Sequence, residues 1–330
     1  MSKFNFQDAS LLSVLQTQIS NVNVRVMETP LTDITYPTLV PVNTAYAEWQ
    51  PDTQAITMGA GVGEAKWITG YAKDVPLVET SATMSAIPFA VFSVGYETNW
   101  EELGLAANAG MNISDVKARI GRRKAEEFIQ ARVLTGDADK GWTGLINKTG
   151  ITPTSASTKA ATGTQWINND GSLNATAAEI AQDLMNLILG PVVAASAVRP
   201  IVADTVALPS LAYRALASTF TDVLNGGVSY LEYIRRQIAG AVPGTTFQFV
   251  EIPELATAAT VGIVGGGRAI GYRRSVDVLE LPVPFAFRYL NEYRDAPFGV
   301  MTPGWARIGQ VTVWESRAFR YLDGVTPVPA

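Results

Sequence analysis

The sequence is most informative over residues 112–147, NISDVKARIGRRKAEEFIQARVLTGDADKGWTGLIN. Charged side chains recur here at helical spacing, and Arg122–Glu126 is an i,i+4 pair that supports a helix. The opposite face is apolar and consists of Val116, Ile120, Ala125, Phe128, Ile129 and Ala131. This pattern predicts an amphipathic helix of about five turns over about 114–135, with Ser114 as its N-terminal cap.

The residues on either side predict a turn after this helix and a shorter helix before it. Gly136 ends the long helix, and the stretch DADKG at 137–141 is typical of a tight turn. Asn99 can cap an earlier helix, Trp100–Asn108, which we expect to stop at Gly110.

Residues 43–98 predict a long two-stranded loop. Three closely spaced glycines, Gly59, Gly61 and Gly63, lie between strand-like segments, and residues 86–96, AIPFAVFSVGY, strongly favour a strand. Because an isolated hairpin is marginally stable in water, this loop should pack against its own body or against another chain.

Residues 1–42 have the pattern of an arm. Asp8 can cap a short helix with Leu11, Leu12, Leu15 and Ile19 on one face, and residues 22–26, VNVRV, alternate as a strand does. Such a segment has one apolar face and no second layer, so it must lie on something else. The sequence leaves two possibilities open, a strap across its own domain and an arm that reaches a neighbouring subunit.

An α/β unit follows the linker-like residues 150–173, over about 170–265. Thr176 and Glu179 form a capping box before a helix with the buried stripe Ile180, Leu184, Leu187 and Ile188, closed by Gly190. Pro209 should start a second helix, and a third should present Val228, Leu231, Ile234 and Ile238 and end at Gly240. The strands expected in this unit are Arg199–Asp204, Thr246–Ile252 and Thr260–Val264.

Beyond Arg268 nearly every segment predicts a strand. These strands are Ser275–Leu281, Phe285–Tyr293, Ala306–Trp314 and Ala318–Leu322. Short turns join them, which favours an antiparallel sheet.

Composition argues against most enzyme classes. The 330 residues include no cysteine and no histidine, which excludes disulfides, thiol nucleophiles, histidine metal sites and serine–histidine–acid triads. The net charge is −5, and no basic tail suited to gripping nucleic acid is present. The polar start of the chain and the shortness of its apolar runs predict a soluble protein without a signal peptide or membrane span.

The glycine clusters do not form a nucleotide-binding motif. The cluster at 59–63 has Glu64 where a dinucleotide fingerprint needs glycine, and the cluster at 265–267 has Ile270 at that position. Neighbouring carboxylates such as Glu101 and Glu102 point to different sides of a helix, so they do not form an acid/base pair. We therefore predict no catalytic, cofactor-binding or metal-binding residue, and no enzymatic activity.

The long helix has a small excess of positive charge. Six basic residues against three acidic ones give it a charge of +3: Lys117, Arg119, Arg122, Arg123, Lys124 and Arg132 against Asp115, Glu126 and Glu127. Two interpretations are open, non-specific contact with DNA phosphates and a solvated face held by i,i+4 pairs, and we favour the second.

The order of these elements resembles the major capsid proteins of tailed bacteriophages, the Hong-Kong-97-type capsid fold shared with bacterial encapsulin shells. The resemblance is at residue level in YETNWEEL at 96–103, in Ala106–Gly110, in the helix Asn112–Val133, which looks like the spine helix of that family, and in LTGD at 134–137 through GWTGLIN at 141–147. The C-terminal Arg307–Gly324 is similar to the final strand pair of the family. In topology the resemblance covers nearly the whole chain.

The resemblance implies an α+β fold with an N-terminal arm (1–42), an extended β loop (43–98), a peripheral domain with a long spine helix (99–155), an α/β axial domain (156–267) and return strands that complete both domains (268–330). It also implies that the axial domain crowds five- and six-fold axes, and that the arm and loop cover neighbouring subunits. Some members cross-link a loop lysine to an asparagine. Lys66 and Lys73 lie in this loop, but no pattern identifies a partner, so we expect no cross-link.

The expected function is therefore that of a virion capsid protein, assembled in the host cytoplasm through hexamers and pentamers into an icosahedral shell around double-stranded DNA. The expected partners are further copies of the chain, a portal, a separate scaffold protein, and packaged DNA by non-specific contact, with a decoration protein as a further candidate and no membrane partner. Two alternatives stay open at this point, an encapsulin-like shell around a cargo enzyme and a soluble α/β enzyme.

Overall fold

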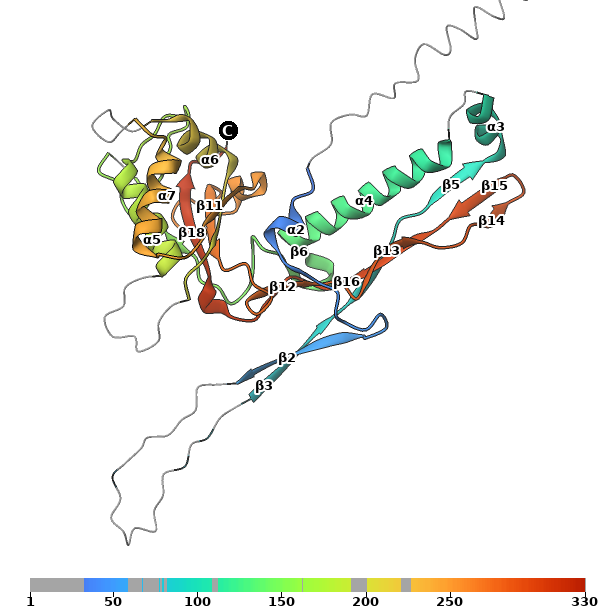
Figure 1. The fold of residues 1–330 in the computed structure, drawn as a ribbon, viewed down its shortest axis with the longest axis horizontal. Coiled ribbons are helices and arrows are strands. Elements are labelled where there is room, and N and C mark those ends of the chain that lie inside the picture. The colour runs from blue at the N-terminus through green and yellow to red at the C-terminus, as the bar shows by residue number, and fades with distance from the viewer. Residues whose placement is uncertain are drawn as a thin grey trace, which may run out of the picture. The chain divides into compact units, whose positions relative to one another are not determined.

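The computed structural model describes residues 33–58, 67, 77, 79, 82–108, 112–161, 163–190, 201–220 and 227–329. The chain is α+β, as predicted, and it divides into two compact units (Figure 1). The larger unit comprises residues 36–90, 129–286 and 307–330, and the smaller unit includes residues 91–128 and 287–306.

A five-stranded sheet forms the centre of the larger unit. Its order is β10-β9-β11-β18-β8, with β10 and β9 parallel, β18 and β8 parallel, and β11 antiparallel to both of its neighbours. The strands are β8 (Thr154–Ser155), β9 (Thr205–Leu208), β10 (Gln248–Glu251), β11 (Gly267–Tyr272) and β18 (Phe319–Thr326).

Three helices pack beside this sheet and complete its core: α5 (Ala177–Leu189), α6 (Ser210–Ser218) and α7 (Tyr230–Ala241) (Figure 1). The Thr176–Glu179 capping box starts α5, and Ile180, Leu184, Leu187 and Ile188 are buried, as predicted. Burial of this apolar stripe, rather than helix propensity alone, stabilises α5.

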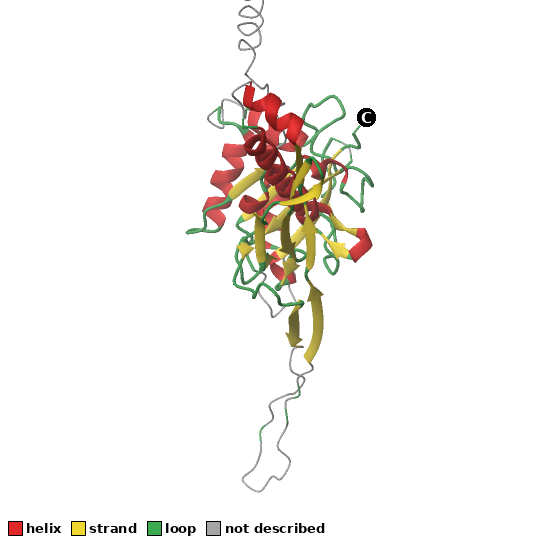
Figure 2. Ribbon diagram, turned by 90° about the vertical axis from the view of Figure 1, so that its right-hand side faces the viewer, coloured by secondary structure: helices red, strands yellow, loops and turns green. Residues whose placement is uncertain are grey.

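Smaller elements surround this core. They are α2 (Tyr36–Leu39), the sheet β1 (Val42–Asn43)-β12 (Leu279–Pro282)-β17 (Thr312–Val313), the pair β6 (Gly136–Asp137)-β7 (Trp142–Thr143), and three short 3-10 helices at Ala138–Lys140, Pro253–Thr257 and Ser316–Ala318. The larger unit also includes a ribbon of two strands, β2 (Asp52–Met58) and β3 (Ala82–Pro88), which Figure 2 shows as a narrow pair of strands.

The smaller unit is a thin layer of strands with one long helix. Its elements are β4 (Ala90–Ser93), β5 (Tyr96–Asn99), α3 (Trp100–Asn108), α4 (Ile113–Thr135), β13 (Phe285–Tyr289), β14 (Tyr293–Ala296), β15 (Gly299–Thr302) and β16 (Gly304–Ile308). The strands form two sheets, β13-β16-β4 and β14-β15-β5. Residues of α4 up to Phe128 belong to this unit, and the last turns of the helix belong to the larger one.

A hydroxyl group fixes α4 on its sheet. Tyr289 on β13 donates a 2.7 Å hydrogen bond to the carbonyl of Ala118, and Phe92 on β4 packs against Phe128 with ring centroids 4.8 Å apart. A Cβ added at Gly121 would overlap the Tyr289 hydroxyl, so a larger residue at this position would have to displace that side chain. The long helix predicted over about 114–135 is confirmed, since α4 runs from Ile113 to Thr135.

Several expected boundaries were wrong. The cap of α4 is Asn112, whose side chain accepts from the Asp115 amide at 3.4 Å, and Ser114 lies inside the helix. Residues 201–204 are not a strand, since β9 begins at Thr205. Residues 260–264 form turns instead of a strand, because the two glycines that follow them reverse the chain before β11. Expected features at residues 1–32, around the loop glycines, at Lys66 and Lys73 and at residues 191–200 lie outside the described residues.

The later helices and strands also differ in detail. Pro209 is the cap of α6 and not its first residue, and α7 continues through Gly240 while Val228 precedes it. The C-terminal strands do not form one antiparallel sheet, since they are distributed over four sheets, and the hairpin β14-β15 was not anticipated. Long-range pairing, which local patterns do not report, determines this distribution.

Candidate assembly surfaces

The ribbon β2-β3 is a two-stranded sheet with exposed apolar side chains. Its seven residue pairs run from Asp52↔Pro88 to Met58↔Ala82, and among the described residues no other strand pairs with it. Ile87 and Phe89, at its base, are buried, whereas Met84 is 60% exposed. In the loop beyond, Trp67 is fully exposed and Leu77 is 78% exposed. Because a lone hairpin is marginally stable, these apolar side chains mark a surface that needs a cover.

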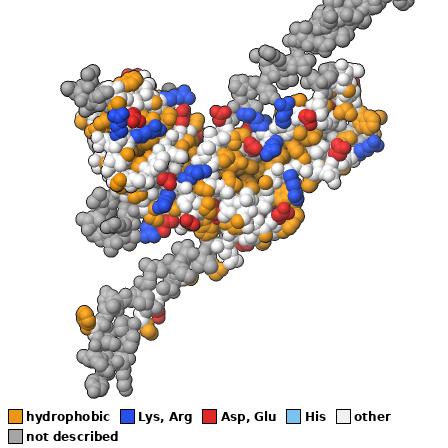
Figure 3. Space-filling view, in the orientation of Figure 1, with side chains coloured by type: hydrophobic (Ala, Val, Ile, Leu, Met, Phe, Trp, Pro, Cys, Tyr) orange, Lys and Arg blue, Asp and Glu red, His pale blue; other side chains and the backbone are white. Residues whose placement is uncertain are grey.

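A second exposed apolar surface lies at α3 and the β14-β15 turn, and we call it the tip. It consists of Trp100, Leu103, Leu105 and Phe298. Helix α3 has no buried residue, and Phe298 is 72% exposed. The Trp100 amide donates to the Phe298 carbonyl at 3.0 Å, so the helix and the turn are joined. Figure 3 shows hydrophobic side chains gathered at this end of the smaller unit.

The charged face of α4 is largely paired. Arg122–Glu126 at 3.7 Å confirms the expected i,i+4 pair, and Arg123–Glu127 at 3.4 Å adds a second. Hydrogen bonding from Lys117 lowers the pKa of Glu102, and bonding from Lys124 lowers that of Glu127. Exposed pairs of this kind contribute little stability, but they neutralise the basic residues. The geometry favours a solvated helix face over a strongly DNA-attracting one.

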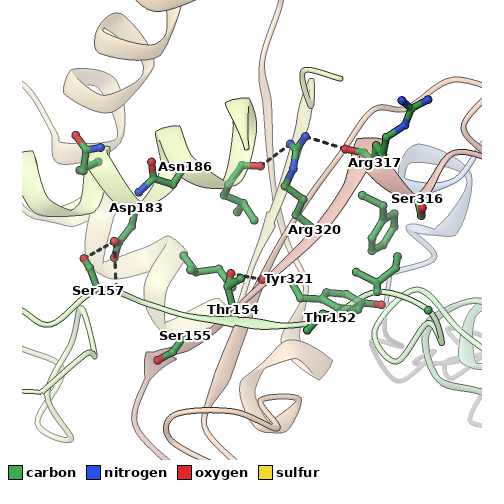
Figure 4. Close-up of a pocket in the computed structure, with 16 residues that line it drawn as sticks. Thr152, Thr154, Ser155, Ser157, Asp183, Asn186, Ser316, Arg317, Arg320 and Tyr321 are labelled. Atoms are coloured by element: carbon green, nitrogen blue, oxygen red, sulfur yellow. Dashed lines mark hydrogen bonds between the residues drawn. The ribbon is translucent and has the colours of Figure 1, made fainter. Parts of the chain in front are cut away.

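A cavity of about 720 Å³ in the larger unit lies between β8, α5 and β18 (Figure 4). Its polar walls are engaged in holding the fold together. Arg320 donates to the carbonyls of Leu187, Ile188, Ile201 and Arg317 at 2.7–3.0 Å, which caps the end of α5. Thr154 donates to the carbonyl of Tyr321 at 2.9 Å. These side chains bond to backbone carbonyls and so stabilise the fold, which favours a structural role over a reaction centre.

Ser157, which lines this cavity, contacts the buried Lys159, and some hydrolases use such a serine–lysine pair as nucleophile and base. Here the Lys159 amine donates to the Ser157 hydroxyl at 2.9 Å but also forms a fully buried ion pair with Asp183. Asp183 further accepts from Trp166 Nε1 at 2.9 Å and from the Ser157 hydroxyl at 2.5 Å. Lys159 therefore serves as the cation of a buried network and not as a base.

Neither a metal-binding cluster nor a helix that could span a membrane occurs in the part of the chain that the structure describes. No cluster of three or more acidic side chains suited to a metal ion occurs in it. None of its helices has both the length and the apolar character to cross a bilayer.

Solved structures define the class of fold. The capsid of Myoviridae phage XM1 is similar over 91% of this chain and 95% of that chain, with a TM-score of 0.71 at 16% identity. A chain of Microbacterium phage Oxtober96 matches over 99% and 100% (TM-score 0.59, 12% identity), and the capsid of an empty GTA particle over 92% and 94% (TM-score 0.56, 15% identity). The chain has the Hong-Kong-97-type capsid fold of tailed phages.

Sequence comparison then gives the family. Residues 63–325 match the family model described as Major capsid protein, so this chain belongs to the major capsid protein family. No curated protein sequence matches it significantly. The resemblance stated from sequence is confirmed, and the encapsulin-like alternative is not favoured.

Sequence reasoning identified the ribbon but not the tip. The glycine cluster flanked by strand-like segments was a local signal for β2-β3. Trp100 lies in the helix that the sequence predicted, but Phe298 lies in a turn that was not predicted, so no local pattern joined the two residues. The only available signal for the tip was that α3 has apolar residues around much of its circumference.

Proposed function

We propose that this chain self-assembles through hexamers and pentamers into an icosahedral shell that encloses the double-stranded DNA of a tailed bacteriophage. Membership of the major capsid protein family supports this function. The structural observation that supports it most directly is the ribbon, a two-stranded element with exposed apolar side chains, with which no third strand pairs in the described part of the chain. In a shell, adjacent copies cover these side chains, so burial that one copy lacks becomes intermolecular.

The parts of the chain take roles that follow the family layout. Residues 1–42 act as an arm and 43–98 as a loop over neighbouring copies. Residues 99–155 form a peripheral domain, 156–267 an axial domain at the five- and six-fold axes, and 268–330 return strands shared by both. The scarcity of buried side chains in α3 supports a peripheral role for the smaller unit, since its tip would meet other copies.

Further partners belong to the same proposal. A portal and a scaffold protein would act during assembly in the host cytoplasm, and a decoration protein is a further possible partner. Contact with packaged DNA would be weak and independent of base sequence, because most basic residues of α4 have acidic partners. The role is structural, and we propose no catalysis.

Electron microscopy of the overexpressed full-length chain tests this function. Closed shells or flat sheets of hexamers are the expected result, and a compact monomer at high concentration contradicts it. Mass spectrometry of particles purified from infected cells distinguishes a phage capsid from an encapsulin-like shell. Packaged DNA and a portal protein support the phage capsid, whereas an enclosed enzyme supports the encapsulin-like alternative.

A further inference from the structure

The connector, residues 40–51, joins the N-terminal part of the chain to the ribbon and has little hydrophobic anchorage. After Val40, its side chains are exposed or half-buried. Its strand β1 has only two residues, which pair with Leu281 and Pro282 on β12. Backbone bonds from Leu281 to Pro41 at 2.9 Å and from Val283 to Asn43 at 2.8 Å flank this pairing. So short a ladder does not by itself fix the connector in one place.

One buried carboxylate ties the connector to β12. Glu280 is 2% exposed. Its Oε2 accepts from Asn43 Nδ2 at 2.6 Å, and its Oε1 accepts from the Tyr46 hydroxyl. Burial, and secondarily the bond to Glu280, raises the pKa of Tyr46 to about 12, so the hydroxyl remains a donor. Both donors belong to the connector and both are neutral.

The same contact extends to both strands of the ribbon. The ring of Tyr46 packs edge-on against Phe89, with centroids 5.4 Å apart, and Phe89 directly follows β3. The Phe89 amide donates to the Pro51 carbonyl at 3.0 Å, next to the start of β2. Glu280 is therefore linked through Tyr46 to the end of β3 and to the beginning of β2.

The burial of Glu280 makes this attachment selective. Among the described residues no lysine or arginine forms an ion pair with it, so Asn43 and Tyr46 are its side-chain partners. A buried carboxylate that loses its donors is strongly penalised. Any displacement of the connector by one residue would leave Glu280 without them. The contact thus disfavours alternative positions of the connector, a role that buried polar groups have in other folds.

We propose that Glu280 is a positioning residue for assembly, which fixes the point where the ribbon leaves the body and thereby the angle between adjacent copies in the shell. This inference rests on the proposed function, in which the ribbon covers a neighbouring copy. When the base of the ribbon is held in one place, one inter-subunit angle is favoured. When it is loose, several angles become accessible, and shells of different curvature form.

The test compares particles made by the full-length chain and by four variants. Y46F removes only the hydroxyl and keeps the ring on Phe89, and E280L removes the acceptor at similar volume. The matched control is Y321F, which deletes a buried hydroxyl bonded to the Leu145 carbonyl at 2.7 Å, away from the connector. E280Q keeps one acceptor oxygen and serves as the conservative variant. Particle diameters are measured by electron microscopy and sedimentation velocity.

We expect Y46F and E280L to widen the diameter distribution at least twofold, with tubes or sheets beside shells, and to speed hydrogen exchange in the connector. Y321F should give uniform particles of wild-type diameter, and E280Q an intermediate spread. Uniform wild-type shells from both Y46F and E280L would refute the role of Glu280 and leave the proposed function intact. Failure of the unmodified chain to form any shell would instead contradict the proposed function.

Discussion

Replacing Asp323 by alanine should destabilise the chain more than any surface change, because it breaks a fully buried ionic network. Asp323 is 0% exposed and Arg268 is 3% exposed. The carboxylate accepts from Arg268 Nε at 2.6 Å and Nη2 at 2.8 Å, and from the amides of Thr260 and Val261 at 2.7 and 3.1 Å. One side chain thus joins β18, β11 and the turn before β11.

The expected loss follows from what D323A leaves behind. Arg268 would be a buried cation without its counter-ion, which costs about 3–5 kcal/mol. It keeps its bond to the Ile146 carbonyl at 2.7 Å and its stacking on Tyr321 at 4.3 Å, so the lower half of this range is the better expectation. A loss of this size is a large fraction of the roughly 5–15 kcal/mol that stabilises a typical domain.

Urea unfolding of the unassembled chain, followed by tryptophan fluorescence, measures this loss. The exposed Asp170, which bonds only within its own turn, provides the control, and D170A should leave the midpoint unchanged. The double variant D323A/R268M should recover at least about 2 kcal/mol, since it removes the stranded cation. A loss below about 1 kcal/mol for D323A, or no recovery in the double variant, would refute the reasoning.

Three further outcomes are expected. Burial lowers the pKa of Lys148 to about 8, so above that pH the unfolded chain binds a proton that the folded chain does not. The free energy of unfolding should therefore rise with pH from about pH 8 to about pH 10, by about 2–3 kcal/mol, and pH-dependent urea titrations of K148M should lack this rise. In the middle of α4, G121A should cost about 1–3 kcal/mol by pushing against the Tyr289 hydroxyl, and calorimetry should find the cost abolished in a Y289F background. If G121A remains as costly in the Y289F background, overlap with the Tyr289 hydroxyl is not the cause of the destabilisation. At the tip, F298S should leave the unassembled chain within about 0.5 kcal/mol of wild type yet raise the protein concentration needed for shell formation, as light scattering would report; unchanged assembly would remove the tip from the interface.

Elements with strong local signals were predictable from the sequence. Helix α5 has a capping box, a four-residue apolar stripe and a closing glycine within fifteen residues, and all of them were found where expected. The end of α4 at Gly136 was equally clear, since glycine there has a positive φ of 79°. The ribbon was recognised because strand-like sequence continues on both sides of a glycine cluster.

Features that depend on distant residues could not be predicted. Strand β9 lies between β10 and β11, and its start at Thr205 is set by that pairing rather than by the apolar run before it. Asp323 and Arg268 are 55 positions apart, and nothing local marks either as a member of a buried pair. Glu280 is a further example, because its partners are more than 230 positions away. The tip was missed for the same reason, because it combines α3 with the β14-β15 turn, which lies far along the chain.

Exposed apolar side chains on the ribbon and the tip are the physical link between this structure and a shell. Exposed hydrophobic surface is costly in a monomer and becomes favourable when copies cover one another, at about 25 cal/mol per Å² removed from water. Most of the larger unit, in contrast, buries a continuous core of its own around the five-stranded sheet. The chain therefore combines a core that it buries itself with exposed apolar elements that we expect neighbouring copies to cover.

Hydrogen–deuterium exchange of the ribbon before and after assembly tests this dependence most directly. The backbone amides of β2 and β3 should exchange rapidly in the unassembled chain and at least tenfold more slowly in shells, while those of the central strand β11 stay protected in both. Equal and slow exchange of the ribbon in the unassembled chain would show that a single copy already covers it, and would contradict the account.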